Sequence, residues 1–443
     1  MRTCTARLPI ALLLAVLLLA SAAPLFGQFT VGGQILQRSD FRNGYGKLID
    51  TTQSPAVFIG HRARIHALYT HEKVRLHVSV QDVRTWGNTE QTKATDAFLS
   101  VHEAWAEILF NAHWNLKLGR QELTYDEARF LGNLDWALQA RAHDFALLRY
   151  EKGATKVHVG GGYNVGAESL AQQAYAVQNQ YKDAQFLRAE QRWGGFTISA
   201  MLWNNGLEQQ TIDSTGAVVS YITRHSQTFG LPTLRYERGR FTVGGFFYAQ
   251  AGKDRTNRDL EAYDAGASAS YALPLDSARG SALRFTLGAE LLSGTAQNAT
   301  DNVNRSYNPF YGTNHAWNGY MDYFYVGGRW GSSVGLMDAH LRLRYDPGKR
   351  TFISLNVHDF QAAAEVLRNG EKMDRRLGTE LDFTVGHLLN EVVSLQFGYS
   401  HMLPTETMER LQGVAAPASV QNWAYLAILY RPNMKNRFAG LKF

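Results

Sequence analysis

Polar and apolar residues alternate along most of this chain, in short segments separated by clusters of Gly, Asn, Asp and Pro. In residues 73–83, for example, Leu76 and Val78 lie on one face of an extended strand, and Arg75 and His77 lie on the other. A period of two residues predicts β-strands, so we expect an all-β protein. The same alternation is found in residues 56–69, 98–110, 155–163, 185–193, 196–203, 234–237, 263–271, 283–290, 338–345, 353–358, 377–385 and 393–400, and residues 423–430 are a further expected strand segment.

The beginning of the chain has the composition of a secretory signal peptide. Arg2 and Arg7 precede the apolar stretch Ile10–Ala20, and small residues follow it. We therefore expect residues 1–27 to be cleaved from the exported protein. The single cysteine, Cys4, lies in this segment, so we expect neither a disulfide nor a thiolate metal site in the mature chain.

Residues 28–443 favour a membrane-spanning antiparallel β-barrel over a water-soluble β-sandwich or propeller. The strands reach about ten residues, the length that a tilted membrane strand needs. The chain ends on Phe443, as outer-membrane barrels commonly end on an aromatic residue. A charge on the lipid face near the midplane costs about 2–4 kcal/mol, so the arginine-rich faces should line the lumen. We expect roughly sixteen to eighteen strands around an aqueous channel, in the outer membrane of a Gram-negative bacterium.

Two long connections, Gly166–Lys182 and Leu292–Gly319, are predicted to face the outside, because outer-membrane barrels place tight turns in the periplasm. Residues Gln361–Arg375 have helical composition and predict a short loop helix. The last strand ends either at Tyr430 or within Arg437–Phe443, and these alternatives change the strand count by one.

The stretch His113–Tyr150 combines much charge with much aliphatic surface. It contains a Gly-Arg-Gln triplet that ends at Gln121, then an acidic turn, an Asp-Trp pair that ends at Trp136, and an Arg-x-x-Asp-Phe run. A second motif, GTNHAWNGYMDYFY, occupies Gly312–Tyr325. The late segments LGTELDFTVGH and FGYSHMLPTE add two further motifs.

In this order, these motifs resemble the alginate-export family of outer-membrane β-barrels, from about Glu103 to near the C-terminus. The resemblance implies an 18-stranded barrel whose electropositive lumen passes a polyuronate chain outward. In this family His315 and Trp317 would belong to a large loop that precedes a strand. The first fifty or so mature residues carry no motif that matches.

Arginines spaced along the lumen would bind a polyanion, because the planar guanidinium group matches the geometry of a carboxylate. Strict alternation places Arg120 with Leu116 and Leu118, on the outer face. The resemblance implies a channel arginine at this position, so we expect a bulge at Gly119 that turns Arg120 inward. The predicted pore-lining residues are Arg62, Arg64, Arg75, Arg120, Arg141, Arg188, Arg192, Arg235, Arg342 and Arg344, with Glu107, Asp144, Glu290, Asp322 and Asp382 as carboxylates that pair with some of them. Each arginine could instead brace a loop or solvate a wide pore.

No enzymatic constellation, metal pattern or cofactor motif emerges. The histidines form no H-x-x-x-H or H-E-x-x-H pattern, and Ser400 and His401 point to opposite faces of a strand. We therefore expect no catalytic residue, no metal and no cofactor. The expected partners are an anionic polysaccharide such as alginate or other anionic solutes, outer-membrane lipid and the barrel-assembly machinery, with periplasmic secretion partners compatible and nucleic acid not expected. The alternatives are a general or anion-selective uptake porin and, less favoured, an outer-membrane enzyme or an adhesin with a plugged lumen.

Overall fold

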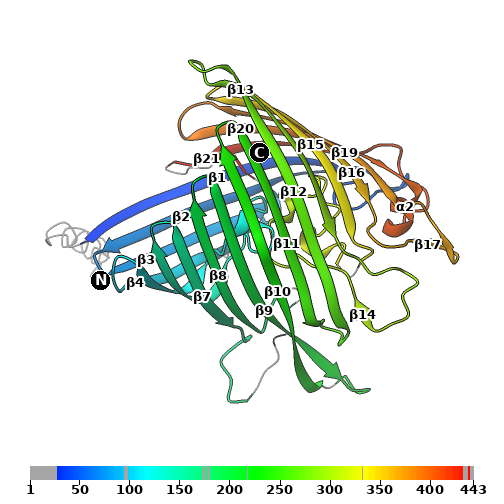
Figure 1. Cartoon of the computed structure of the whole chain (residues 1–443), viewed down its shortest axis with the longest axis horizontal. Coiled ribbons are helices and arrows are strands. Elements are labelled where there is room, and N and C mark those ends of the chain that lie inside the picture. Colours follow the sequence, from blue (N-terminus) through cyan, green and yellow to red (C-terminus); the bar gives the residue numbers. More distant parts are fainter. Residues whose placement is uncertain are drawn as a thin grey trace, which may run out of the picture.

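The computed structural model describes residues 27–93, 98–171, 175, 177, 180–216, 218–331, 333–432 and 438–439. The predicted signal peptide therefore lies outside the described residues, apart from Gly27. Within them, the chain forms a closed antiparallel β-barrel of 18 strands (Figure 1). No helix in this part of the chain has the length and hydrophobicity that crossing a membrane requires.

Each barrel strand pairs with its neighbour along the chain, and β1 pairs with β21 to close the ring. The barrel strands are β1 (Gly27–Asn43), β2 (Ala56–His71), β3 (Val74–Thr85), β4 (Leu99–Leu109), β5 (Trp114–Gln121), β6 (His143–Lys152), β7 (Thr155–Tyr163), β8 (Asp183–Trp193), β9 (Phe196–Ile212), β10 (Val218–Arg238), β11 (Phe241–Lys253), β12 (Asp259–Asp276), β13 (Ser281–Leu292), β15 (Leu336–Gly348), β16 (Thr351–Gln361), β19 (Arg376–Leu388), β20 (Val393–Pro404) and β21 (Gln421–Tyr430).

The shorter elements lie in the connections. They are η1 (Asp126–Ala128), β14 (Val303–Asn304), η2 (Asn314–Ala316), η3 (Val326–Gly328), β17 (Leu367–Arg368), β18 (Glu371–Lys372) and α2 (Glu406–Gln412). The predicted helix in Gln361–Arg375 is wrong, since a small hairpin of β17 and β18 occupies this segment. Asn369 and Gly370 both have positive φ at its tip, which an Asn-Gly pair adopts readily, and this turn outweighs the helical composition around it.

The alternation of the strands separates two faces as predicted. On β15, Leu341 and Tyr345 are exposed on the outside, whereas Asp338 and His340 are buried on the inside. Exposed apolar residues such as Leu287 continue this outer surface around the barrel. In water such a surface would be unfavourable, so it is the part of the barrel that contacts lipid.

Long and short connections alternate between the two ends of the barrel. The short turns include 72–73, 153–154, 194–195, 239–240 and 349–350. The start of β1 and the end of β21 lie at the same end as these turns, because Gly27 pairs with His71 and Tyr430 pairs with Val393. Short turns face the periplasm in outer-membrane barrels, which places the long connections at the extracellular end.

The last barrel strand ends at Tyr430. The alternative, a final strand within Arg437–Phe443, falls on residues of which only Phe438 and Ala439 are described. Of these two, Ala439 is buried and its carbonyl oxygen accepts a hydrogen bond from Gln396 on the inner face of β20. Ala439 therefore lies against the inner face of the barrel.

Candidate functional site: the lumen and its two inserted segments

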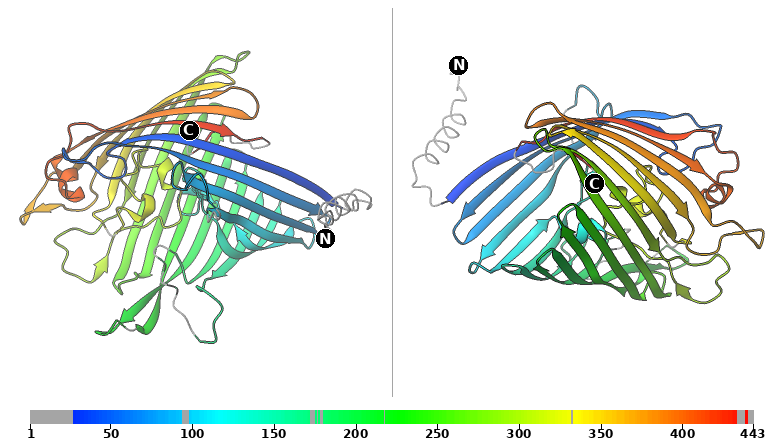
Figure 2. Two further views of the ribbon diagram at one scale, coloured as in Figure 1. Left: turned by 180° about the vertical axis from the view of Figure 1, so that it is seen from behind. Right: turned by 45° about the horizontal axis from the view of Figure 1, so that its top comes forward.

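Two long connections fold back into the barrel and lie inside it (Figure 2, cyan and yellow). The first inserted segment, residues 122–142, joins β5 to β6, and the second inserted segment, residues 293–335, joins β13 to β15. Leu123, Phe130 and Trp136 of the first segment are almost fully buried. The second long loop was expected to face the outside, and that expectation is wrong for its central part, where residues 310–325 are nearly all buried.

Ionic contacts attach the first inserted segment to the barrel wall at widely separated strands. Asp126 bonds the guanidinium of Arg188 on β8 at 2.7 Å, and Glu127 bonds Arg235 on β10 at 2.8 Å. Arg129 forms a buried ion pair with Glu290 on β13. The acidic turn of the sequence motif is thus a set of anchors that reaches across the lumen.

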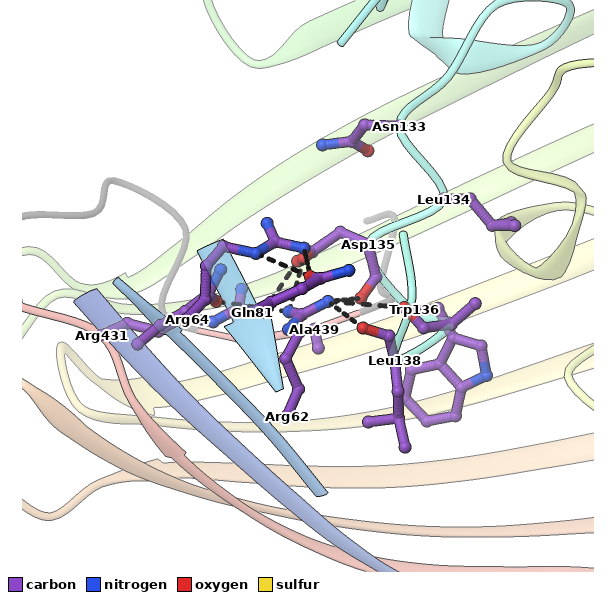
Figure 3. A network of polar contacts seen from close by, with 12 residues as sticks. Arg62, Arg64, Gln81, Asn133, Leu134, Asp135, Trp136, Leu138, Arg431 and Ala439 are labelled. Carbon is purple, nitrogen blue, oxygen red and sulfur yellow. Dashed lines mark hydrogen bonds and ion pairs between the residues drawn. The ribbon is translucent and has the colours of Figure 1, made fainter. Parts of the chain in front are cut away.

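Asp135 anchors the opposite end of the same segment (Figure 3). Its carboxylate accepts hydrogen bonds from Arg62 on β2 at 2.7 Å and from Arg431 at 2.8 Å, and both arginine side chains are essentially inaccessible to solvent. Burial opposes the ionisation of Asp135, but the two guanidinium charges outweigh it and hold the pKa of this carboxyl well below its usual range. Arg62 also donates to the carbonyl oxygens of Asp135, Ala137 and Leu138, so most of its hydrogen bonds go to the segment.

The two inserted segments pair with each other inside the barrel. Leu131 and Tyr311 form a parallel β-bridge, and the amide of Gly132 donates to the carbonyl oxygen of Tyr311 at 2.9 Å. The ring of His315 stacks on Trp136 with ring centroids 4.2 Å apart. These contacts join the segments into one unit, so neither is positioned independently.

Glycines of the second motif allow this close packing. A Cβ atom at Gly312 would lie 2.1 Å from the carbonyl oxygen of Arg129, and one at Gly319 would lie 2.6 Å from the carboxylate of Glu380. Gly319 also has a φ of +81°, a conformation that L-residues with a side chain rarely adopt. The motif therefore contains glycine where the second segment touches the first segment and the wall.

Polar groups of the wall hold the second inserted segment from the other side. The amide of Met321 donates to Glu380 at 2.8 Å, and Asn318 donates to Glu290 at 2.9 Å. Within the segment, Nδ1 of His315 lies 2.6 Å from Asp322.

Below the inserted segments, on the side of the short turns, lies a cavity of about 890 Å³. Seven arginines and four carboxylates line it, so the cationic side chains are in excess by three. They are Arg129, Arg188, Arg192, Arg235, Arg240, Arg284 and Arg342, with Asp126, Glu127, Glu190 and Glu237. Trp317 forms part of its ceiling, where the guanidinium of Arg129 lies 3.7 Å from the ring centroid.

Most of the predicted pore-lining residues lie on the inner face of the barrel. From the strands these are Arg62, Arg64, Arg75, Arg188, Arg192, Arg235, Arg342, Arg344, Glu107, Glu290 and Asp382. Only Arg188, Arg192, Arg235 and Arg342 of this group border the cavity below the segments. Arg75 with Glu107 and Arg344 with Asp346 form ion pairs elsewhere on the inner wall.

Several predicted residues hold the inserted segments instead of lining an open path. Arg62 binds Asp135 as described, and Arg64 donates to Gln81, whose own amide donates to the carbonyl oxygen of Gln139. Arg141 belongs to the first segment and donates to the carbonyl oxygen of Gly312 at 3.0 Å. Burial lowers the pKa of Arg141 to about 10.

Predicted residues also contact the second segment. Glu290 accepts a hydrogen bond from the side chain of Asn318, and Asp382 accepts one from the backbone amide of Tyr320. Asp322, His315 and Trp317 are part of the segment itself, as the motif predicts for the last two.

The predicted inward turn of Arg120 is wrong. The register of β5 is continuous on both sides, so Arg120 stays opposite Ala104 in the outward row of Leu118. Asp144, also predicted to face the lumen, lies opposite Arg120 in the same outward row and bonds it at 3.0 Å. Gly119 has positive φ but shifts no pairing, and this is why the expected change of face does not occur.

The sequence-based reasoning missed the main anchors. Asp126, Glu127 and Arg129 were visible as a charged turn, but their partners lie tens to hundreds of residues away in the chain. Asp135 was visible only as part of the Asp-Trp motif, and Arg431 belonged to no motif. The length of the connection between β5 and β6 was the feature that could have indicated a segment folded inward.

Comparison with known proteins places this geometry in a family. The chain matches the alginate export family over residues 30–422. It belongs to that family. No curated protein sequence matches the chain significantly.

Solved structures share the architecture of this alginate export family member. OccAB4 of Acinetobacter baumannii has a TM-score of 0.57 at 10% identity, covering 91% of this chain and 98% of that one. OpdK of Pseudomonas aeruginosa, crystallised with vanillate, has a TM-score of 0.55 at 12% identity, covering 90% and 98%. OpdQ of the same organism has a TM-score of 0.55 at 9% identity, covering 91% and 97%. Together the family and the fold identify an outer-membrane channel.

Proposed function

We propose that this outer-membrane channel passes an anionic polysaccharide such as alginate, passively and in the outward direction. The observation that carries the proposal is the cavity on the short-turn side, with its seven arginines and four carboxylates. An accessible guanidinium such as that of Arg192 can receive a uronate carboxylate through two parallel hydrogen bonds.

The position of the cavity agrees with entry from the periplasm. Its lining includes Gly194, Gly195, Gly239 and Arg240, which belong to the short turns that face this compartment. A polymer that arrives there meets the arginines before it meets the inserted segments.

The carboxylates in the cavity favour the passage of an anionic polymer over its tight binding. Glu190 bonds both Arg188 and Arg192, at 2.7 and 2.9 Å, and Glu237 bonds Arg235 at 2.6 Å. A sugar carboxylate must exchange with these groups, which limits its residence time at each arginine. Conduction requires sites that bind weakly enough to release the solute.

The experiment is a measurement of the reversal potential of the refolded barrel in a planar bilayer under a salt gradient, followed by addition of an alginate oligomer. We expect anion selectivity and a block that is stronger from the side of the short turns. Arg192→Ala should weaken both effects, because more than half of this side chain is exposed in the cavity. Arg120→Ala is the matched control, since that arginine does not line this cavity.

An unselective conductance that ignores the oligomer would contradict the proposal. A barrel with no conductance would favour the adhesin alternative, because the inserted segments would then act as a plug.

The second candidate is an anion-selective uptake porin for small solutes, and the inserted segments favour it because they narrow the lumen. OpdK, with the same fold, was crystallised with the small aromatic carboxylate vanillate. Liposome swelling distinguishes the candidates, since an uptake porin admits a uronate monomer and is indifferent to the oligomer. On either proposal the partners are anionic solutes, outer-membrane lipid and the barrel-assembly machinery, and export adds periplasmic secretion partners.

A further inference from the structure

A cluster of two histidines and one carboxylate lies buried on the inner wall, behind the second inserted segment. Asp338 and His340 are on β15, and His358 is on β16 directly opposite His340. One donor atom from each of the three side chains can be chosen so that all lie within 4.8 Å of one another. All three residues are at least nine-tenths buried.

The contacts within the cluster leave donor atoms without partners. Nδ1 of His358 lies 2.9 Å from Oδ1 of Asp338. Nδ1 of His340 lies 3.8 Å from Oδ2 of Asp338, too far for a hydrogen bond, and no other group bonds it although the side chain is buried. A buried imidazole nitrogen without a partner is unfavourable, and a bound cation would satisfy it.

A second carboxylate is placed to support His358. Nε2 of His358 has no hydrogen-bond partner and lies 3.9 Å from Oδ2 of Asp382. If a metal ion takes the lone pair at Nδ1, the ring proton moves to Nε2, where Asp382 faces it. Histidines that bind metals commonly donate their other N–H to a carboxylate in this way, which fixes the ring.

The charge around the cluster also favours a cation. Glu290, Glu380 and Asp382 are buried on the same region of wall. The cations nearby are Arg129, which is bonded to Glu290, and Arg342, which lies on the same face of β15 as Asp338 and His340. Glu380 accepts from a backbone amide and leaves its second oxygen without a partner. A divalent ion would offset part of this negative charge.

We propose that Asp338, His340 and His358 bind a divalent transition-metal ion such as Zn²⁺. Two imidazoles and one carboxylate are the donors that such ions prefer, whereas Ca²⁺ and Mg²⁺ require oxygen ligands. His340 also lines the cavity, so the ion reaches the site from the lumen and keeps an open coordination position toward it. Asn318 of the second inserted segment lies 3.5 Å from Asp338, which brings the ion next to that segment.

The test is a Zn²⁺ titration of the refolded full-length mature barrel by calorimetry, together with the visible absorption spectrum of the Co²⁺ form. We expect about one equivalent bound and a d–d spectrum typical of mixed nitrogen and oxygen ligands. His340→Ala should weaken Zn²⁺ binding at least tenfold, and this variant should fold because Nδ1 of His340 makes no hydrogen bond. His358→Ala should also weaken Zn²⁺ binding at least tenfold. Heat-modifiable gel mobility checks that each variant is folded.

His102→Ala is the matched control. His102, Glu103 and Glu122 form a second, less buried group that could also attract an ion. Binding lost in His340→Ala and retained in His102→Ala supports the proposal. Absence of binding, binding lost only in His102→Ala, or binding unchanged in all three variants would overturn it.

Discussion

Replacement of Asp135 by asparagine should release one end of the first inserted segment. The carboxylate is the shared partner of Arg62 and Arg431, both almost completely buried. Asparagine has nearly the same shape but no charge, so the variant leaves two buried guanidinium groups without a counter-ion. Breaking a buried ion pair from one side costs about 3–5 kcal/mol.

This cost destabilises the docked position of the first inserted segment and not the barrel, because the barrel strands keep their hydrogen bonds. Each 1.4 kcal/mol changes an equilibrium about tenfold, so the undocked population should rise roughly a hundredfold to several thousandfold. The other anchors, Asp126 and Glu127, keep the segment attached to β8 and β10. We therefore expect a swinging segment, not an unfolded barrel.

The assay is single-channel recording in planar bilayers, with limited proteolysis of the segment as a second readout. Asp135→Asn should give higher conductance, greater open-channel noise and faster cleavage. The double variant Arg62→Gln/Asp135→Asn should cost less than the sum of the single variants, because it removes one of the uncompensated charges.

Asp301→Asn provides the control, since it breaks an exposed ion pair with Arg305 in the second segment and should change none of these readouts. Wild-type conductance, noise and proteolysis in Asp135→Asn would refute the reasoning that this ion pair holds the segment.

Three further predictions concern lipid, cavity and pH. Leu287→Arg places a charge in the outward row of β13 and should lower barrel stability by about 2–4 kcal/mol if the residue lies near the midplane, whereas Thr286→Arg, which faces the cavity, should be tolerated. Heat-modifiable gel mobility at increasing urea concentration measures the stability of both variants. Equal effects would contradict the assignment of the two faces. Trp317→Ala removes the ring that packs on Arg129 and should raise conductance and change the block by an alginate oligomer, and an unchanged channel would exclude Trp317 from the path. The pKa of Asp135 is lower in the folded than in the unfolded state, so this carboxylate stabilises the docked segment fully above about pH 4 and progressively less as the pH falls below that value. Channel noise recorded at pH 3 and pH 6 checks this. The noise should change less between these pH values in Asp135→Asn than in the wild-type protein.

Alternation along the chain was enough to predict the strands and the inner rows, because the two-residue period is a local property of an extended backbone. It placed Arg188 and Arg192 on the inner face and the exposed Leu341 on the outer face without any knowledge of their neighbours. The same rule also held at Arg120, where the motif suggested an exception and the continuous register shows none.

The inserted segments could not be predicted in this way. Whether a long loop lies outside or inside depends on partners such as Arg62 for Asp135 and Glu290 for Arg129, which are distant in sequence. An arginine in an inward row has the same local pattern whether it meets solute or a loop carboxylate. For this reason the sequence located Arg62 correctly but assigned it to the pore lining.

The contact of Asp135 has a consequence for how the ring is completed. Every junction between neighbouring barrel strands is also joined by the chain itself, except the one between β1 and β21. Asp135 bonds Arg62 on β2 and Arg431, the residue that follows β21, and the adjacent Trp136 accepts from Arg38 on β1. The first inserted segment thus bonds both sides of the β1–β21 junction from inside the barrel. These contacts can form only after the last strand has paired with the first.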